Sequence, residues 1–500
     1  MMEDPARPSA PATGQDAVVA FLASPAAHDG VMPEHIETHL SHIFLAGERV
    51  LKLKKARHWS VVDYSTVPQR AHYCREEVRR NAATAPDIYL GVRPVTSGEH
   101  LAIGGDGVPV DWVVEMRRFA KDAQLDAMVD AGTVTPAQID GTADAIAALH
   151  RAASIRRRPD QVASMRALAA QLAQDLTGQL TTPALKTAVA AWAGATDALI
   201  ARHARLLEAR ARHGFVRLCH GDLHLSNICL WQGKPTPFDA LEFAETMATI
   251  DVLHDLAFVL VDLEQRGRDD LSSRLLSRYL EWTRDYGGLA LLPLFKGLRA
   301  MVRALVAVTK ARDPAPAIKA AEAAVLRSPV PRLVAIGGLS GTGKTTLARA
   351  LCPRLSAVVL RSDTTRKHLA GVLPETPLPP SAYCASETRR VYQRMRVDAA
   401  RALRAGWPAI VDATFTEDAE RNAVRALAAA HGAPFTGVWL EAPADTLAAR
   451  VAARTGDASD ADISVLRAQQ RSAGRPRDWA VLDARDNVAR LAEEVAKSCG

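Results

Sequence analysis

The sequence RLVAIGGLSGTGKTT (332–346) joins an apolar run to a glycine-rich turn and then to a helix-forming segment. The turn fits the pattern G-x-x-x-x-G-K-[ST], which is specific when a strand precedes it and a helix follows it. Glycines let backbone N–H groups curl around a phosphate, and the N-terminus of the next helix adds positive partial charge. The stretch therefore predicts a nucleotide-phosphate site made by Gly338, Leu339, Ser340, Gly341, Thr342, Gly343, Lys344, Thr345 and Thr346.

Two side chains of this P-loop have distinct expected roles. Lys344 is expected to reach the β- and γ-phosphate oxygens of ATP, and Thr345 to ligate magnesium. A chance glycine turn is the alternative, and the strand–turn–helix context disfavours it. The chain then alternates helices with apolar strands in SAVVLRSD, PAIVDATF and TGVWLEAP. This order predicts an α/β P-loop NTPase domain with a parallel sheet.

Charged residues follow the ends of these strands. Asp363 ends the second strand, with Arg366 nearby, and Asp412 ends the third. Arg450 and Arg454 lie four residues apart on one expected helix. The plain alternatives are a helix N-cap for Asp363, an ordinary strand-end aspartate at 412, and a solvated arginine face.

Residues 332–500 resemble the small-molecule and polynucleotide kinases of the P-loop class, a group that includes gluconate kinase and zeta-toxin-like kinases. The resemblance implies that Asp363 orients or deprotonates the acceptor hydroxyl and that Asp412 holds magnesium through water. It also implies that Arg450 and Arg454 belong to a lid that closes over the transferred phosphate.

A second motif, HGDLHLSN (220–227), fits H-x-D-x-x-x-x-N, and Asp239 follows twelve residues after its asparagine. Together they resemble the catalytic core of aminoglycoside phosphotransferases and choline kinases. The resemblance implies that Asp222 accepts or orients the substrate hydroxyl proton. Asn227 and Asp239 would hold the magnesium ions that bridge the ATP phosphates, with His220 supporting the loop. Asp251 and Asp255, in TIDVLHDLAFVL, lie on the helix that similar folds use to brace this loop.

The same resemblance requires a strand lysine paired to a helix glutamate. RVLKLKK (49–55) places Lys52 and Lys54 on one strand face, and CREEVRRN (74–81) offers Glu76 and Glu77. Lys52 with Glu77 is the expected pair, and Lys54 remains open as the phosphate-binding lysine. The alternative is a basic edge strand that resists aggregation.

The adenine hinge and the glycine-rich loop are less well defined. Glu115 and Met116, in VVEMRRF, are expected to offer their backbone to adenine. No G-x-G-x-x-G precedes the lysine strand, only THLSHIFLAGE, and Asp239 is followed by Ala-Leu-Glu rather than Phe-Gly. Nucleotide binding in this half is therefore an inference.

The whole chain resembles bacterial two-domain proteins known as bifunctional aminoglycoside phosphotransferase/ATP-binding proteins, through THLSHIFL, KLKKARH, CREEVRRN, HGDLHLSN and GLSGTGKTT. The expected fold is an α+β protein-kinase-like bilobal domain followed by the α/β P-loop domain. The expected boundaries are 1–30 for a flexible N-terminus with the first helix, 31–327 for the kinase-like domain, 328–331 for a linker and 332–500 for the P-loop domain.

Composition limits the class of ligand. The 500 residues carry 62 basic and 56 acidic side chains, a net charge of +6, which suits anionic ligands without requiring nucleic acid. No C-x-x-C pair occurs, and the apolar stretch AVVAFLASPAA is too short to span a membrane, so a cytoplasmic protein is expected. Aminoglycosides are polycations, yet one helix gathers basic residues that would favour an anionic acceptor if they lined the cleft: Lys296, Arg299, Arg303 and Lys310. A solvated basic face is the alternative.

The leading hypothesis is an enzyme that uses ATP and Mg²⁺ to phosphorylate a hydroxyl of a small molecule, at Asp222 and, in the second domain, at Asp363. One alternative is a nucleotide-switched regulator with a degenerate kinase-like module. Another is a polynucleotide 5'-hydroxyl kinase, whose nucleic-acid affinity would fall steeply with salt. It ranks last because the sequence shows no aromatic-rich basic groove. The sequence identifies neither the acceptor nor the oligomeric state.

Overall fold

The computed structural model describes residues 14–59, 62–157, 160–327, 330–453, 458–472 and 474–499. The chain forms two compact units. The first comprises Met1–Val134, Leu149–Arg157 and Gly214–Asp255, and the second Thr135–Ala148, Arg158–His213 and Leu256–Gly500. The division passes through the expected 31–327 domain rather than at 328–331, because helices that follow residue 256 pack against the P-loop domain.

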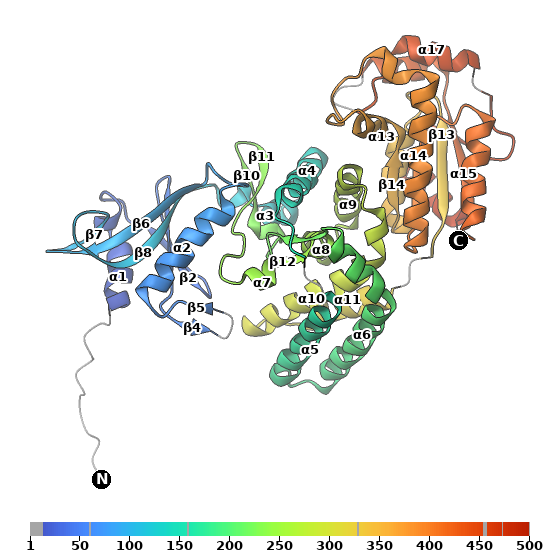
Figure 1. Ribbon diagram of the computed structural model, residues 1–500. Coiled ribbons are helices and arrows are strands. Elements are labelled where there is room, and N and C mark those ends of the chain that lie inside the picture. Colours follow the sequence, from blue (N-terminus) through green and yellow to red (C-terminus); the bar gives the residue numbers. More distant parts are fainter. Residues whose placement is uncertain are drawn as a thin grey trace. The chain divides into compact units, whose positions relative to one another are not determined.

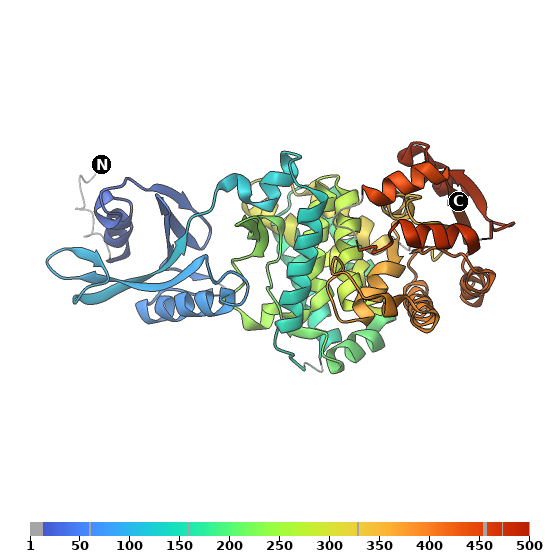
Figure 2. The ribbon, with the colours of Figure 1, turned by 90° about the horizontal axis from the view of Figure 1, so that it is seen from above.

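The first unit contains an antiparallel sheet of six strands in the order β1-β2-β3-β8-β6-β7. Their bounds are β1 Glu34–Glu37, β2 Ser41–Ala46, β3 Arg49–Lys54, β6 Tyr89–Ser97, β7 Leu101–Ile103 and β8 Val108–Arg117. Apolar residues alternate along these strands and form two cores. Helix α1 (Gly14–Leu22) packs on one and α2 (Val67–Asn81) on the other, so the two helices cover opposite faces of the sheet (Figure 2).

The remaining elements of the first unit position the motif loop. The HGDLHLSN segment lies between β9 (Val216–Leu218) and β10 (Ile228–Trp231), and η3 (Leu225–Asn227) forms its end. Asp239 follows β11 (Lys234–Pro237), which pairs with β10. The other short elements are η1 Pro25–Ala27, β4 His58–Trp59, β5 Val62–Asp63, η2 Lys121–Ala123, α3 Leu125–Asp130, α7 Glu245–Ala248 and β12 Thr249–Asp251.

Seven long helices follow the sheet: α4 Pro136–Ala152, α5 Gln161–Gln179, α6 Pro183–Arg212, α8 Val252–Gln265, α9 Asp269–Thr283, α10 Leu292–Thr309 and α11 Ala315–Leu326, with η4 Tyr286–Leu291 before α10. Thr135 caps α4, because Thr135 and Gln138 exchange backbone and side-chain hydrogen bonds. Helices α5, α6, α10 and α11 pack together as a bundle (Figure 1). Helix α9 packs against the P-loop domain.

The C-terminal part is the predicted parallel α/β domain. Its five strands run in the order β14-β15-β13-β16-β17, with the strand before the P-loop in the centre. The sequence missed β17. The bounds are β13 Leu333–Gly338, β14 Val358–Arg361, β15 Ala409–Asp412, β16 Phe435–Glu441 and β17 Ala480–Asp483, with helices α12 Lys344–Leu355, α13 Ser362–Leu369, η5 Pro380–Tyr383, α14 Ala385–Arg404, α15 Asp418–Ala430, α16 Ala444–Ala452, α17 Ile463–Ser472 and α18 Val488–Ser498. Among the described residues, no helix has the length and apolar character needed to cross a membrane.

Candidate active sites

The motif loop of the first unit brings Asp222 and Asn227 together. The Asn227 side-chain amide donates to the backbone oxygen of Asp222 at 2.9 Å and to its Oδ2 at 3.2 Å. Asn227 is buried, whereas the Asp222 side chain is 42% exposed. The amide therefore fixes the orientation of a carboxylate that solvent, and a substrate hydroxyl, can reach.

Two buried residues support this loop from behind. Asp255 accepts the backbone N–H groups of His220 and Gly221, both at 3.0 Å, and contacts His150 Nε2 at 3.1 Å. The His220 ring contacts the Phe238 carbonyl oxygen at 2.9 Å, one residue before Asp239. Burial lowers the pKa of His220, so its ring stays neutral near pH 7. Of the two aspartates expected to brace the loop, Asp255 does so.

Asp251 caps the helix that carries Asp255. Its Oδ1 accepts the Leu253 N–H at 2.9 Å, at the N-terminus of α8. Asp251 is the last residue of β12, directly before α8. Asp255 lies one full turn into α8, and from there its side chain reaches the backbone N–H of His220.

We expect Asp255→Ala to lower the free energy of unfolding by about 2–4 kcal/mol, because several buried donors lose their acceptor. Asp251→Ala removes the acceptor that caps α8, and the expected cost of losing that cap is about 1 kcal/mol. Urea unfolding of both variants, followed by circular dichroism, makes the comparison. Equal losses would show that Asp255 is no more than a helix residue.

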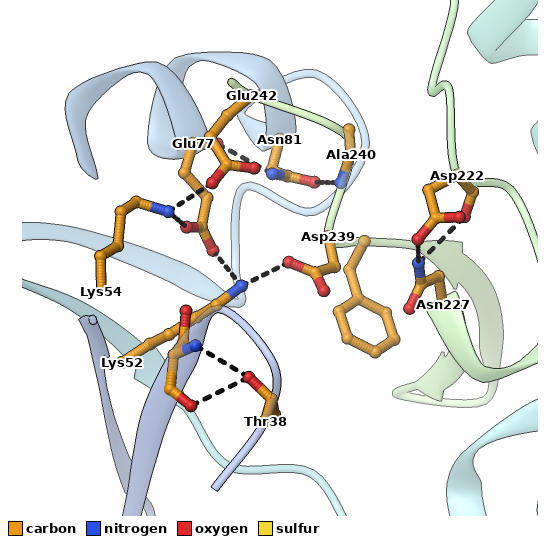
Figure 3. A network of polar contacts seen from close by, with 12 residues as sticks. Thr38, Lys52, Lys54, Glu77, Asn81, Asp222, Asn227, Asp239, Ala240 and Glu242 are labelled. Atoms are coloured by element: carbon orange, nitrogen blue, oxygen red, sulfur yellow. Dashed lines mark hydrogen bonds and ion pairs between the residues drawn. The ribbon is translucent and has the colours of Figure 1, made fainter. Parts of the chain in front are cut away.

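The expected Lys52–Glu77 ion pair is present, with Lys52 Nζ 2.8 Å from Glu77 Oε1. Lys52 also lies 2.5 Å from Asp239 Oδ1, and Figure 3 shows these side chains beside Asn227 and Asp222. Burial by itself lowers the pKa of Lys52, but Asp239 and Glu77 outweigh it and raise that pKa well above its ordinary value. A charged lysine thus stands between the helix glutamate and the candidate metal ligand. Lys54 binds the other oxygen of Glu77, at 2.7 Å, so the basic-edge alternative does not describe this strand.

Glu115 and Met116, the residues expected to offer their backbone to adenine, lie near the end of β8. Both residues lie inside β8, flanked by β3 on one side and β6 on the other, so their backbone groups belong to the sheet. Glu115 also accepts from Arg49 Nε at 2.6 Å. The sheet ends at Arg117, and the connection to the following elements is therefore residues 118–120.

In the second unit the P-loop has the predicted strand–turn–helix form. Gly341 and Gly343 have φ of +86° and +84°, and a Cβ on Gly341 would lie 2.9 Å from the Leu447 carbonyl oxygen, so glycine is required there. Lys344 Nζ donates to the Leu339 carbonyl oxygen at 2.9 Å, which folds the side chain over the loop. The loop therefore already has the curved backbone that cradles phosphate.

The candidate metal ligands of this domain lie together. Thr345 Oγ1 donates to Asp412 Oδ2 at 2.6 Å, although 67 residues separate them. Arg361 pairs with Asp412 in the register of β14 and β15, and Asp363 follows two residues later, at the same edge of the sheet. Asp363 lies in the first turn of α13, whose N-cap is Arg361, so the N-cap alternative for Asp363 is excluded.

Of the two arginines expected in a lid, the structure describes Arg450. Arg450 donates to the carbonyl oxygens of Gly341, at 3.5 Å, and Ala484, at 3.0 Å. It lines a cavity of about 240 Å³ beside the N-terminus of α12, together with Thr342, Gly343, Thr346, Leu347, Leu440, Ala484, Asp486, Val488 and Leu491. Arg450 is thus anchored on the wall of a cavity beside the P-loop. Arg454 lies outside the described residues.

Neither predicted anion-binding group is available as expected. Arg366 uses its guanidinium internally, donating to the Ala382 carbonyl oxygen at 2.6 Å and to Thr388 Oγ1 at 3.3 Å. On α10, Lys296 pairs with Glu264 at 2.6 Å, and Arg303 pairs with Asp262. Arg299 is buried, with its guanidinium over the Phe258 ring. The basic face is therefore largely neutralised, because acidic partners on α8 were not visible in the pattern of α10.

Comparison with known proteins gives two family matches. The family described as "Phosphotransferase enzyme family" matches residues 119–292, and the one described as "AAA domain" matches residues 333–476. An uncharacterized protein of Mycobacterium tuberculosis is 30% identical over 460 residues, which cover 89% of this chain and 90% of that protein. A Mycobacterium bovis protein matches with the same identity and coverage.

Among solved structures, a choline/ethanolamine kinase family protein from Mesorhizobium loti is 15% identical and covers 63% of this chain and 96% of its own, with a TM-score of 0.39. A gluconokinase from Sinorhizobium meliloti is 20% identical and covers 35% of this chain and 93% of its own, with a TM-score of 0.26. The mycobacterial similarity runs through both the sheet-and-motif half and the P-loop half of the chain.

Proposed function

This chain belongs to the bacterial two-domain family in which a phosphotransferase domain precedes an ATP-binding P-loop domain, and we propose that its first domain transfers the γ-phosphoryl group of ATP to a hydroxyl of a small molecule. The observation that carries the proposal is the grouping of Lys52, Glu77 and Asp239 beside the Asp222–Asn227 pair (Figure 3). Phosphoryl transfer needs these parts: a cation for the phosphates, oxygen ligands for magnesium and a carboxylate for the acceptor proton.

Each side chain then has one chemical task. Asp222 is the candidate base, since its carboxylate is exposed and its orientation is fixed by Asn227. Lys52 supplies positive charge for the phosphates, and Glu77 holds that lysine in place. The side-chain nitrogen of Asn227 donates to Asp222, so its side-chain oxygen is the atom that would bind a metal.

The residues present fit magnesium in both domains, because Mg²⁺ prefers carboxylate, amide and hydroxyl oxygens. In the first domain Asn227 and Asp239 would hold it, and in the second Thr345 and Asp412 would. When bound, magnesium neutralises charge that develops on the phosphates. For the second domain we propose a P-loop ATP site, with Asp363 at the strand edge as the candidate acceptor base.

One observation favours the alternative of a nucleotide-switched regulator. The turn between β1 and β2 is closed on itself, with Thr38 N–H donating to the Ser41 carbonyl oxygen at 2.8 Å and Ser41 N–H to Thr38 Oγ1 at 2.9 Å. Those donors are not offered to phosphate, as the backbone of a glycine-rich loop would be.

The decisive experiment supplies the full-length chain with Mg²⁺ and ATP labelled on the γ-phosphate, in the presence of a panel of hydroxyl-bearing metabolites. We expect acceptor-dependent transfer of label, and Asp239→Asn is expected to reduce its rate by about 10²–10³-fold, since one charged metal ligand is lost. Tight ATP binding with no label in any acceptor would reject phosphotransfer and favour the regulator. A polynucleotide acceptor would be recognised by a steep loss of affinity with salt.

A further inference from the structure

Two lysines of β3 share one glutamate. Lys52 and Lys54 are two residues apart and therefore face the same side of the strand. Glu77 gives Oε1 to Lys52 and Oε2 to Lys54. Each lysine also binds a carboxylate from one short loop, Lys52 that of Asp239 and Lys54 that of Glu242 (Figure 3). The loop is thus joined to the strand at two points.

The two points differ in burial. The outer pair is open, with the Lys52 side chain 12% exposed and that of Asp239 38% exposed. The inner pair is sealed, with the Lys54 side chain 1% exposed and that of Glu242 8% exposed. Glu242 also accepts from the buried Tyr64 hydroxyl at 2.7 Å. Burial by itself would lower the pKa of Lys54, but Glu242 and Glu77 outweigh it and raise that pKa well above its ordinary value.

Asp239 needs external support because its backbone is in the left-handed region, with φ of +61°. This conformation costs a residue with a β-carbon about 1–3 kcal/mol, and it persists only where contacts with surrounding residues stabilise it. Its N–H donates to the Tyr89 hydroxyl at 3.1 Å, and the Ala240 N–H donates to Asn81 Oδ1 at 3.0 Å. These neutral contacts, and the charged contact at Glu242, fix the position of the carboxylate.

We propose that Lys54 and Glu242 form a permanent tether that holds Asp239 in place when the outer pair opens during turnover. The inference rests on the proposed function, in which Lys52 turns to phosphate and Asp239 to a metal, so that neither can hold the other. The inner pair faces no substrate and stays closed. Lys54 and Glu242 are positioning residues, and they answer the question of why the strand carries two lysines.

In the protein-kinase pattern, a Phe-Gly follows the metal-binding aspartate and its packing helps to set the position of that aspartate. This chain has no Phe-Gly after Asp239, and the tether would position Asp239 instead. The Lys54–Glu242 ion pair fixes the loop relative to the strand. Glu242 is three residues after Asp239, so it reaches Lys54 only while the backbone between them keeps its turn. The same spacing, K-x-K on the strand with D-x-x-E on the loop, defines the device in sequence.

The test uses Lys54→Met, Glu242→Gln and the double variant, all in the full chain with Lys344→Ala added so that metal binding reports on the first domain. The probe is Mn²⁺ with a non-hydrolysable ATP analogue, read by electron paramagnetic resonance. We expect each single variant to weaken Mn²⁺ binding about tenfold or more, and the double variant to be no weaker than the worse single, since both remove one tether. Lys55→Met, which removes a pair with the exposed Glu37 and a hydrogen bond to the Thr38 carbonyl oxygen at 2.6 Å, is the matched control and should change Mn²⁺ binding less than twofold.

Glu242→Gln keeps a hydrogen-bond acceptor for Lys54 and Tyr64, so it stays informative if Lys54→Met fails to fold. A fall in melting temperature with unchanged Mn²⁺ affinity would overturn the proposal, because the pair would then be only structural. Additive losses in the double variant would overturn it as well. Phosphoryl transfer is measured separately: a chain that binds Mn²⁺ and the analogue but transfers nothing disproves the proposed function, while the binding data still decide the tether.

Discussion

Asp222→Asn should reduce acceptor-dependent phosphoryl transfer by about 10²–10⁴-fold, the contribution typical of a positioned general base. Asparagine keeps the size of the side chain and can still contact the Asn227 amide, and the bond from that amide to the residue 222 backbone oxygen is unchanged. The change therefore removes the proton acceptor, together with the negative charge that lies 3.4 Å from His224 Nε2. Steady-state rates should show the loss in kcat, with the KM for ATP within about threefold of the wild type.

Ser226→Ala is the matched control for this variant, because Ser226 lies in the same loop and its hydroxyl bonds to Asp126 rather than to Asp222. It should keep at least about a third of the wild-type rate, since only the hydrogen bond from Ser226 to the Asp126 carboxylate is lost. Full turnover by Asp222→Asn would refute the first domain as a kinase. Parallel losses of rate and of ATP affinity would instead assign Asp222 to nucleotide binding.

The residues that the sequence placed correctly belong to motifs with fixed local spacing. Asp222 and Asn227 meet because one turn of chain joins them, and the P-loop curves because its glycines adopt conformations closed to other residues. Thr345 and Asp412 could be paired in advance because parallel strands end at one edge of a sheet. Lys52 and Glu77 needed the family pattern as well, since periodicity alone gave two lysines and two glutamates.

The features that the sequence did not predict depend mostly on contacts between residues far apart in the chain. Glu242 lies 188 residues from Lys54, and nothing local distinguishes it from an exposed loop glutamate. VVEMRRF has no turn residue to mark where β8 stops, so the sequence did not show that Glu115 and Met116 lie within a strand. The basic face of α10 looked available because its acidic partners, Glu264 and Asp262, lie on another helix. Charge patterns on one element indicate a binding surface only after neighbouring elements are known.

The second large effect is expected at the P-loop. Lys344→Ala should weaken Mg²⁺-dependent ATP binding to the second domain by about 10–100-fold, since charge-assisted hydrogen bonds contribute about 1.5–3 kcal/mol. Lys344 Nζ donates to the Leu339 carbonyl oxygen at 2.9 Å. That neutral contact is readily exchanged for phosphate. Calorimetric titration of the full chain should resolve two classes of nucleotide site and show one of them weakened.

Arg354→Ala is the control for Lys344→Ala, because this arginine ends the same helix and its guanidinium contacts only the Ala350 carbonyl oxygen among the contacts described for it. Its effect on ATP affinity should be less than about twofold. Two titration classes that both persist in Lys344→Ala would show that the P-loop is not a nucleotide site.

Comparing the turnover of this variant with that of Asp222→Asn then shows which domain carries out phosphoryl transfer. Acceptor-dependent turnover lost only in Asp222→Asn assigns it to the first domain, and turnover lost only in Lys344→Ala assigns it to the second. Loss in both single variants would mean that the two sites work in series, because each lies in a separate fold with its own candidate base, cation and metal ligands.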